Sequence, residues 1–464
     1  MNRKALAAVC VVIVLAVAAS AIVIGRDGGG NGGDGGPDTG MYRGYDAYYE
    51  YTTSGATSDT YTARLDRVLS SEEVLFVQSA LEGYPLKVIG SGALADCSSR
   101  VIVLPATVTT MEEGALSDCR AEEIVLLGGM PDGADPDDGR LRMLDVNGGT
   151  VPTATVPSDT GDLLFLMYGE GAVLLEADGS GTLELPGSVE SPDGTVRPVT
   201  MVGCDSFRSS SYTSVVMPSS VERIGTRAFY GCEGLVSVTL PEGLASVEDE
   251  AFRHCPALAG IDLGSVSFIG FEAFRECRSL VEVVIPDSVT FLGAGAFYVC
   301  SSMERVSVGT GVTSLPDRVF GYGTVLTEVE LRGDVVYVGS YAFAMCPILE
   351  RISLPDAREI GSSAFAECRM LSEVELGSVE ALGNSVFSNC RSIASMELPG
   401  TLERMGSEVF VGCRSLADLW FGGPMPTMEE DSLLGTDCAV HVPESEADSW
   451  EGFPGELLFY RRLR

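Results

Sequence analysis

The feature that most constrains this chain is a phrase of 22 or 23 residues that recurs from residue 202 to about residue 434. One copy, residues 224–241, reads I-G-T-R-A-F-Y-G-C-E-G-L-V-S-V-T-L-P. Its phenylalanine recurs at Phe207, Phe229, Phe252, Phe274, Phe297, Phe320, Phe343, Phe365, Phe387 and Phe410. Leu433 takes the same position in a degraded last copy. A fixed period of this length predicts a solenoid, because each unit has an apolar face that only a stacked neighbour can bury.

Within one repeat, the segment L-x-x-V-x-L alternates apolar and polar positions, which is typical of a short strand with one buried face. We expect Val238 and Leu240 to point into the core, and Ser237 and Thr239 to point outward. The segment I-G-x-x-A-F turns the chain back, and its glycine tolerates backbone angles that other residues avoid. The phenylalanines are therefore predicted to form one stacked internal spine.

The strings A-F-x-x-C-x-x-L-x-x-V-x-L-P, such as those beginning at residues 296 and 364, resemble the BspA-like class of leucine-rich repeats. That class occurs in cell-surface proteins of bacteria, archaea and protists. The resemblance implies a mainly β fold, a leucine-rich-repeat solenoid of stacked short parallel strands with β-hairpin caps. It also implies a surface protein that binds other proteins. Because one fold serves many functions, the resemblance does not identify a ligand.

The N-terminal segment predicts a membrane anchor. Arg3 and Lys4 precede an uncharged apolar run, residues 5–25, which is long enough to cross a bilayer as a helix. The two cations place the N-terminus in the cytoplasm and the repeat region outside. The alternative is a signal peptide cleaved near Ala21, which would give a secreted protein. We favour the uncleaved anchor, followed by a glycine-rich tether that is too rich in glycine to fold.

The remaining chain divides where the repeat is interrupted. A tyrosine-rich stretch is predicted to form a first hairpin, and two looser repeats follow with Leu94 and Leu116 in the phenylalanine position. An acidic loop and several strand candidates then cap the main array. The predicted segments are a signal anchor or transmembrane helix (1–25), a glycine-rich tether (26–40), an N-terminal hairpin with two divergent repeats (41–127), an acidic loop and β-hairpin cap (128–200), the leucine-rich-repeat array (201–435) and a C-terminal cap (436–464).

The cysteines are predicted to be free. Eight of the thirteen lie three residues after a repeat phenylalanine, so they form a column with one thiol per coil. Parallel side chains in such a column do not suit disulfide geometry, and buried cysteine packs as a small apolar residue. Asp135, Asp137 and Asp138 are a candidate calcium site, but they do not complete an EF-hand loop and are interpreted as a solvated acidic loop. No metal and no cofactor are predicted.

The charge balance argues against several function classes. With 66 acidic and 30 basic residues, the net charge is −36, which argues against nucleic acid and anionic lipid surfaces as partners. An enzyme is not predicted, because His254 and His441 are far apart in the sequence and no nucleophile with a base is evident.

Protein binding is the favoured hypothesis. In leucine-rich repeats, the outward positions of the stacked strands form a continuous face. Here that face becomes acidic toward its C-terminal half, which suits a basic protein patch. The predicted ligand-binding residues are Arg305, Glu328, Glu330, Arg351, Glu373, Glu375, Glu397, Asp418 and Trp420. We expect an adhesion module whose partner is a protein or a cell-surface or matrix component, with the membrane contacted through the N-terminal helix alone. The alternative is a structural cell-envelope protein without a discrete ligand.

Overall fold

The computed structural model describes residues 39–44, 47–54, 62–72, 74–81, 84–143, 153–168, 170–453 and 457–460. All of these lie in one compact unit, Pro37–Arg464. The predicted anchor, and the predicted tether as far as residue 38, lie outside the described residues. Within the described part of the chain, no helix is both long enough and apolar enough to span a bilayer. The described architecture is mainly β, as predicted, and its helical content is the 3-10 helix η2 (Glu444–Trp450).

The first region contains two sheets. Its strands are β1 (Thr39–Arg43), β2 (Tyr48–Ser54), β3 (Thr62–Leu69), β4 (Val74–Phe76), β5 (Ala80–Leu81), β6 (Tyr84–Ile89), β7 (Val101–Leu104), β8 (Thr110–Met111), β9 (Glu123–Leu126) and β10 (Leu141–Met143). β1 and β2 pair in antiparallel orientation, so the tyrosine-rich stretch forms a hairpin. β4, β7, β9 and β10 form a parallel sheet. Leu94 is fully buried in the core of this region, and Leu116 packs against that core.

A β-hairpin cap begins the main array. Its strands are β11 (Thr153–Ser158), β12 (Gly161–Tyr168), β13 (Gly171–Glu184), β14 (Ser188–Glu190), β15 (Val196–Val202) and β16 (Ser211–Val216). β11, β12 and β13 are antiparallel neighbours. The long strand β13 also pairs in parallel with β15 near its start and with β16 near its end. One strand therefore covers the open end of both strand rows of the array, which a solenoid requires.

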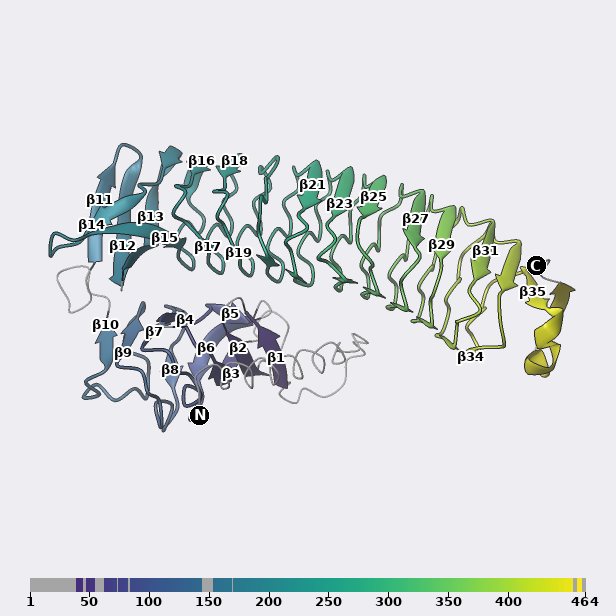
Figure 1. Ribbon diagram of the computed structural model, residues 1–464, viewed down its shortest axis with the longest axis horizontal. Coiled ribbons are helices and arrows are strands. Elements are labelled where there is room, and N and C mark those ends of the chain that lie inside the picture. The colour runs from purple at the N-terminus through teal and green to yellow at the C-terminus, as the bar shows by residue number, and fades with distance from the viewer. Residues whose placement is uncertain are drawn as a thin grey trace, which may run out of the picture. The chain divides into compact units, whose positions relative to one another are not determined.

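The array contains two rows of parallel strands, and successive coils follow one another along it (Figure 1). One row, here called the strand face, continues from β16 with β18 (Ser237–Thr239), β21 (Glu282–Ile285), β23 (Arg305–Val308), β25 (Glu328–Leu331), β27 (Arg351–Leu354), β29 (Glu373–Leu376), β31 (Ser395–Leu398), β33 (Asp418–Phe421), β35 (Ala439–Pro443) and β36 (Leu457–Tyr460). The other row contains two-residue strands: β17 (Arg223–Ile224), β19 (Ser246–Val247), β20 (Phe268–Ile269), β22 (Phe291–Leu292), β24 (Ser314–Leu315), β26 (Tyr337–Val338), β28 (Glu359–Ile360), β30 (Ala381–Leu382), β32 (Arg404–Met405) and β34 (Thr427–Met428).

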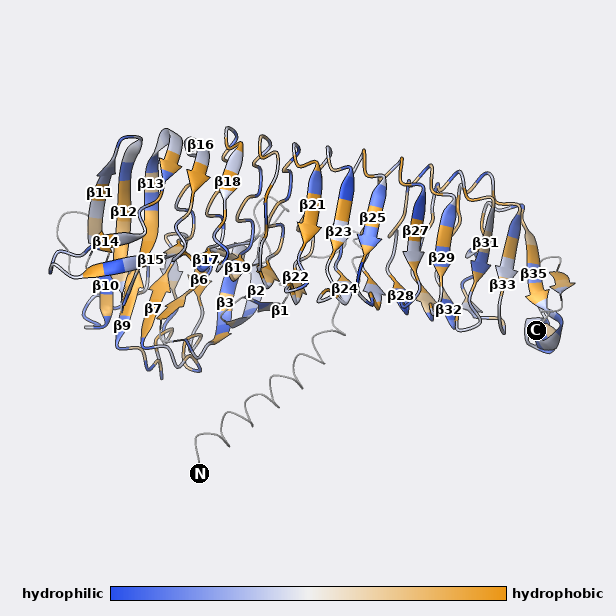
Figure 2. Ribbon diagram, turned by 45° about the horizontal axis from the view of Figure 1, so that its top comes forward, coloured by the Kyte–Doolittle hydropathy of each residue, from blue (hydrophilic) through white to orange (hydrophobic). Residues whose placement is uncertain are grey.

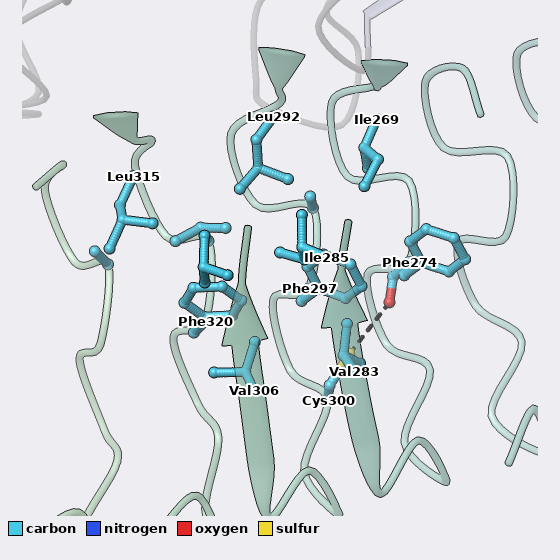
Figure 3. Packing of buried hydrophobic residues seen from close by; sticks show 14 of the residues in the cluster. Ile269, Phe274, Val283, Ile285, Leu292, Phe297, Cys300, Val306, Leu315 and Phe320 are labelled. Carbon is cyan, nitrogen blue, oxygen red and sulfur yellow. Dashed lines mark hydrogen bonds between the residues drawn. The ribbon is translucent and has the colours of Figure 1, made fainter. Parts of the chain in front are cut away.

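The repeat phenylalanines form the predicted spine. All ten side chains are fully buried. Neighbouring rings along the spine lie 4.5 to 6.0 Å apart between centroids, and most pairs are nearly parallel. Figure 3 shows three of these residues, Phe274, Phe297 and Phe320, in adjacent coils beside aliphatic residues from both strand rows. Each ring thus contributes both buried apolar area and stacking contacts, which hold the coils in register.

The cysteine column is a hydrogen-bonded ladder. The thiol of Cys300 donates to the carbonyl oxygen of Phe274, one coil earlier, at 3.3 Å (Figure 3). The same bond recurs at Cys232, Cys255, Cys277, Cys346, Cys368, Cys390 and Cys413. The described cysteines are free, as predicted. Burial raises the pKa of Cys300 to about 12, so this thiol keeps its proton at neutral pH.

The turn that follows each two-residue strand, here called the turn side, uses left-handed backbone twice per coil. These positions lie two residues before and two residues after the spine phenylalanine, as at Arg227 (φ 58°) and Gly231 (φ 73°). Alternate amides of this turn point along the array toward the next coil. The N–H of Phe229 donates to the carbonyl oxygen of Ala251 at 2.7 Å, and the N–H of Gly231 donates to the carbonyl oxygen of Arg253 at 2.9 Å. The left-handed residues therefore allow every coil to bond to the next one on the turn side as well as on the strand face.

Candidate functional site

The strand face presents all nine predicted binding residues to the outside of the array. Along each of these strands, polar outward residues alternate with buried apolar ones, as in the pattern of β27 (Figure 2). The alternation arises because successive side chains of a strand point to opposite faces. Seven of the nine residues are exposed, whereas Asp418 and Trp420 are half-buried.

The nine residues form three groups by strand pairing, because the strand face is divided into separate hydrogen-bonded sheets. β23 and β25 belong to one sheet, β27 and β29 to a second, and β31, β33, β35 and β36 to a third. Group one is Arg305, Glu328 and Glu330; group two is Arg351, Glu373 and Glu375; group three is Glu397, Asp418 and Trp420.

The expected continuous face is also interrupted nearer the N-terminus. The coil at residues 260–263 forms no strand, although its sequence fits the repeat. The side chain of Asp262 accepts the backbone N–H of Gly264 at 3.0 Å, which bends the chain locally. Gly260 lacks a side chain to pack, and Gly264 adopts a left-handed conformation (φ 51°). These features compete with strand pairing, so β18 and β21 are not neighbours in one sheet.

Local pairing neutralises part of group one. Arg305 forms ion pairs with Glu282 at 2.9 Å and with Glu304 at 3.7 Å. The hydrogen bond that the Arg305 guanidinium donates to Glu282 raises the pKa of Arg305. Glu330 accepts a hydrogen bond from Ser307 at 2.6 Å. Glu328, which lies beside Arg305 on the adjacent strand, has no hydrogen bond or ion pair from its carboxylate to any described residue.

The carboxylates of groups two and three are less neutralised. Glu375 accepts a hydrogen bond from Ser353 at 2.6 Å, a contact that leaves its charge in place. Arg351 lies beside Glu373 in the paired strands, but the described residues hold neither side chain in an ion pair. Glu397 is likewise exposed without such a partner among the described residues. This part of the face therefore carries a surplus of negative charge.

An aromatic cluster closes the C-terminal end of the strand face. His441 lies beside Trp420 in β35, and their rings stack at 3.7 Å between centroids. The ring nitrogen Nε2 of His441 lies 2.7 Å from a carboxylate oxygen of Asp418. Tyr460 packs edge-on against Trp420 at 5.2 Å. Trp420 was predicted to lie on the face, but His441 was missed, because the strand register places it beside Trp420 at a spacing of 21 residues, outside the 22- or 23-residue period.

The acidic loop is organised by an arginine. Arg140 forms an ion pair with Asp138 at 2.7 Å and donates to the carbonyl oxygen of Cys119 at 2.9 Å. The hydrogen bond from Arg140 lowers the pKa of Asp138. The Asp138 carboxylate, which a calcium ion would need as a ligand, is therefore already paired with the Arg140 guanidinium. The described residues also contain no group of three histidine, cysteine or acidic side chains arranged to hold a metal ion.

The stacked coils, the buried spine and the cysteine column agree with a known family. The model of the BspA type leucine rich repeat region matches six copies, over residues 81–130, 200–324 and 313–438. The chain belongs to this family. Its BspA-type repeats include the two divergent coils of the first region as well as the main array. Comparison with curated proteins found no match.

Several solved structures are similar to this BspA-type chain. The leucine-rich repeat protein TpLRR of T. pallidum is 31% identical, over 47% of this chain and 91% of that one, with a TM-score of 0.37. A leucine-rich cell surface protein of Faecalibacterium prausnitzii is 23% identical, over 64% and 96% of the two chains, with a TM-score of 0.41. The pneumococcal vaccine antigen PcpA is 17% identical, over 68% and 100%, with a TM-score of 0.39.

Proposed function

We propose that this BspA-type protein is displayed on a cell surface and binds another protein through its strand face, as an adhesion or recognition module. The supporting observation is the state of Glu328, Glu373 and Glu397. These carboxylates are exposed and, among the described residues, have no hydrogen bond or ion pair. Unneutralised charge on a regular surface favours a partner of opposite charge, so the partner carries a basic patch.

Charge reversal of the face tests this function. The full-length protein is probed against an array of purified extracellular proteins, and the hits are compared with those of a triple variant, Glu328→Lys, Glu373→Lys and Glu397→Lys. Each reversal replaces an attraction between one glutamate and a basic group of the partner by a repulsion, which costs about 1 kcal/mol. The three reversals together are therefore expected to weaken binding by about 100-fold. Binding of the wild type is also expected to fall as salt rises.

A second triple variant, Glu359→Lys, Glu403→Lys and Glu429→Lys, is the matched control. These residues are exposed and lie beside the other strand row, at β28, β32 and β34. The control changes the net charge by the same amount and is expected to bind normally. Equal weakening by both variants would attribute the effect to net charge and not to the strand face. A protein that binds nothing on the array but assembles with itself would support the structural envelope role instead.

The membrane anchor belongs to the same proposal and rests on the apolar run of residues 5–25. We expect protease treatment of intact cells to release repeat-region fragments. Protection of that region would contradict the proposed display. The mass of the mature N-terminus distinguishes the uncleaved anchor from the secreted alternative.

A further inference from the structure

The turn side of the array carries a group of large exposed side chains that neither the spine nor the strand face uses. Here called the tyrosine patch, it consists of Tyr298, Arg318, Tyr322 and Tyr341, in the turns after β22, β24 and β26; Figure 2 labels β22 and β24. Tyr322 and Tyr341 are 40% and 37% exposed. The rings of Tyr298 and Tyr322 meet edge to face at 5.4 Å, and the guanidinium of Arg318 lies 5.7 Å from the ring centre of Tyr341.

Arg318 differs from the turn-side arginines of earlier coils because its side chain forms no ion pair with a carboxylate of the described residues. Arg227 pairs with Glu250 at 2.9 Å, and Arg253 pairs with Glu272 at 2.6 Å. Around Arg318, the described residues provide no carboxylate within ion-pair distance. The adjacent carboxylate of Asp317 interacts electrostatically with Arg318 without an ion-pair contact, and it accepts the backbone N–H of Ser340 at 2.7 Å. In a chain with 66 acidic residues, this guanidinium is left available to an external partner.

The fold does not require these side chains. Arg318, Tyr322 and Tyr341 have φ angles of 58°, 61° and 60°, in the left-handed region that bulky residues avoid. At the equivalent positions, other coils use residues of every size, from Gly231 and Ser363 to Arg227 and Met345, so the turn does not itself require a large aromatic side chain. Left-handed backbone costs a non-glycine residue roughly 1–2 kcal/mol, and half-exposed rings regain little of this by burial.

The composition of the patch matches the centre of a protein interface. Tyrosine and arginine are enriched in the residues that dominate binding energy, and aspartate and glutamate are depleted there. We propose that the tyrosine patch is a second protein-binding surface, and that it takes a segment presenting a carboxylate among apolar or aromatic side chains. The carboxylate pairs with Arg318, and the flanking apolar groups pack on Tyr322 and Tyr341. This surface is separate from the acidic strand face. The partner proposed for the strand face is basic, whereas the segment proposed for the tyrosine patch is acidic.

The experiment selects peptides from a displayed random library on the full-length protein, and then measures their affinities by fluorescence polarisation. The expected consensus is Asp or Glu next to Phe, Tyr, Trp or Leu. Tyr341→Ser and Arg318→Ser introduce the residue that other coils carry in the same left-handed position, so both variants are expected to melt like the wild type. Each is expected to weaken peptide binding by at least about 10-fold.

Two matched controls remove comparable exposed groups outside the patch. Met370→Ser removes an apolar side chain that is 45% exposed. Arg369→Ser removes an arginine that already pairs with Glu367 at 3.0 Å. Both are expected to bind the peptides normally. Binding through the patch uses one ion pair, so it is expected to fall less steeply with salt than binding through the strand face, and the two proposals can fail separately.

Four results would overturn the proposal. The first is selection of no peptide at all. The second is a selected peptide that binds Tyr341→Ser or Arg318→Ser as tightly as the wild type. The third is a basic consensus that is lost on charge reversal of the strand face. The fourth is a dimer in sedimentation that dissociates in Tyr341→Ser, which would make a second copy of the chain the occupant.

Discussion

The spine predicts that a ring in the middle of the array is worth more than a ring at its end. Phe297 contacts two rings, Phe274 at 5.2 Å and Phe320 at 6.0 Å between centroids. Phe410 contacts one spine ring, Phe387 at 5.6 Å, because Leu433 takes the next position. We compare Phe297→Leu with Phe410→Leu. Leucine fits this environment, since Leu94 is fully buried at the corresponding position of the first region.

The magnitude follows from the contacts removed. Both phenylalanines are fully buried, so the loss of ring volume costs about the same at each site, about 1–2 kcal/mol. Each stacked pair adds about 1 kcal/mol beyond burial. The expected destabilisation is about 3–4 kcal/mol for Phe297→Leu and about 2–3 kcal/mol for Phe410→Leu.

Native-state hydrogen exchange measures this difference as the opening free energy of amides in the affected coils. A local measurement is required because a long repeat array does not unfold in one step. Equal losses at the two sites, or a larger loss at Phe410, would refute the view that ring stacking holds adjacent coils together.

Two further predictions concern the backbone and the thiols. Val299 is a β-branched residue at φ 63°, where Gly231 and Gly412 stand in other coils, so Val299→Gly is expected to raise stability by about 1 kcal/mol. Asn389→Gly, at φ 61°, is the control and should gain less, because asparagine tolerates this region; a lower melting temperature for Val299→Gly would contradict the reasoning. Burial raises the pKa of Cys300, Cys346 and Cys413 to about 12, above the unfolded value of about 8.5. Above pH 8.5 the unfolded thiols lose protons that the folded ones keep, so stability is expected to fall by about 1.4 kcal/mol per pH unit for each thiol. Melting curves from pH 8 to 10 measure this slope, which should be shallower in Cys300→Ser, and a flat profile would show that these thiols ionise in the folded state.

Features that depend on the period were predictable from the sequence. The spacing of Phe207 to Phe410 identifies one residue per coil, and such residues must stack if the coils do. The free thiols follow from the same argument, because Cys232 and its equivalents keep a fixed distance from the phenylalanine. The spacing did not predict that each thiol donates a hydrogen bond. It depends on which carbonyl group the thiol faces, and the sequence does not show that Cys300 reaches the oxygen of Phe274.

Features that depend on competition between local and repeating contacts were not predictable. Asp262 occupies an ordinary outward position in the repeat, yet its bond to Gly264 removes the strand from that coil. The left-handed positions of Arg318 and Tyr341 were also hidden, because most coils place non-glycine residues there and so give no glycine signal. The nine candidate residues could be assigned to the face by alternation, but their division into three groups follows from breaks in pairing that alternation does not encode.

The cysteine ladder has a consequence for how such a chain reaches its fold. Each thiol bonds to a residue only 25 or 26 positions earlier. The turn-side amides bond within their own coil, as Tyr230 bonds to Arg227, or to the next coil, as Phe229 bonds to Ala251. Contacts over such short separations give a relative contact order of about 0.05 in a chain of 464 residues, which is below the range of helical bundles and far below that of β-sandwiches. The entropy lost in closing each coil is therefore small and nearly constant, so a β protein of this length can assemble coil by coil in the order of synthesis.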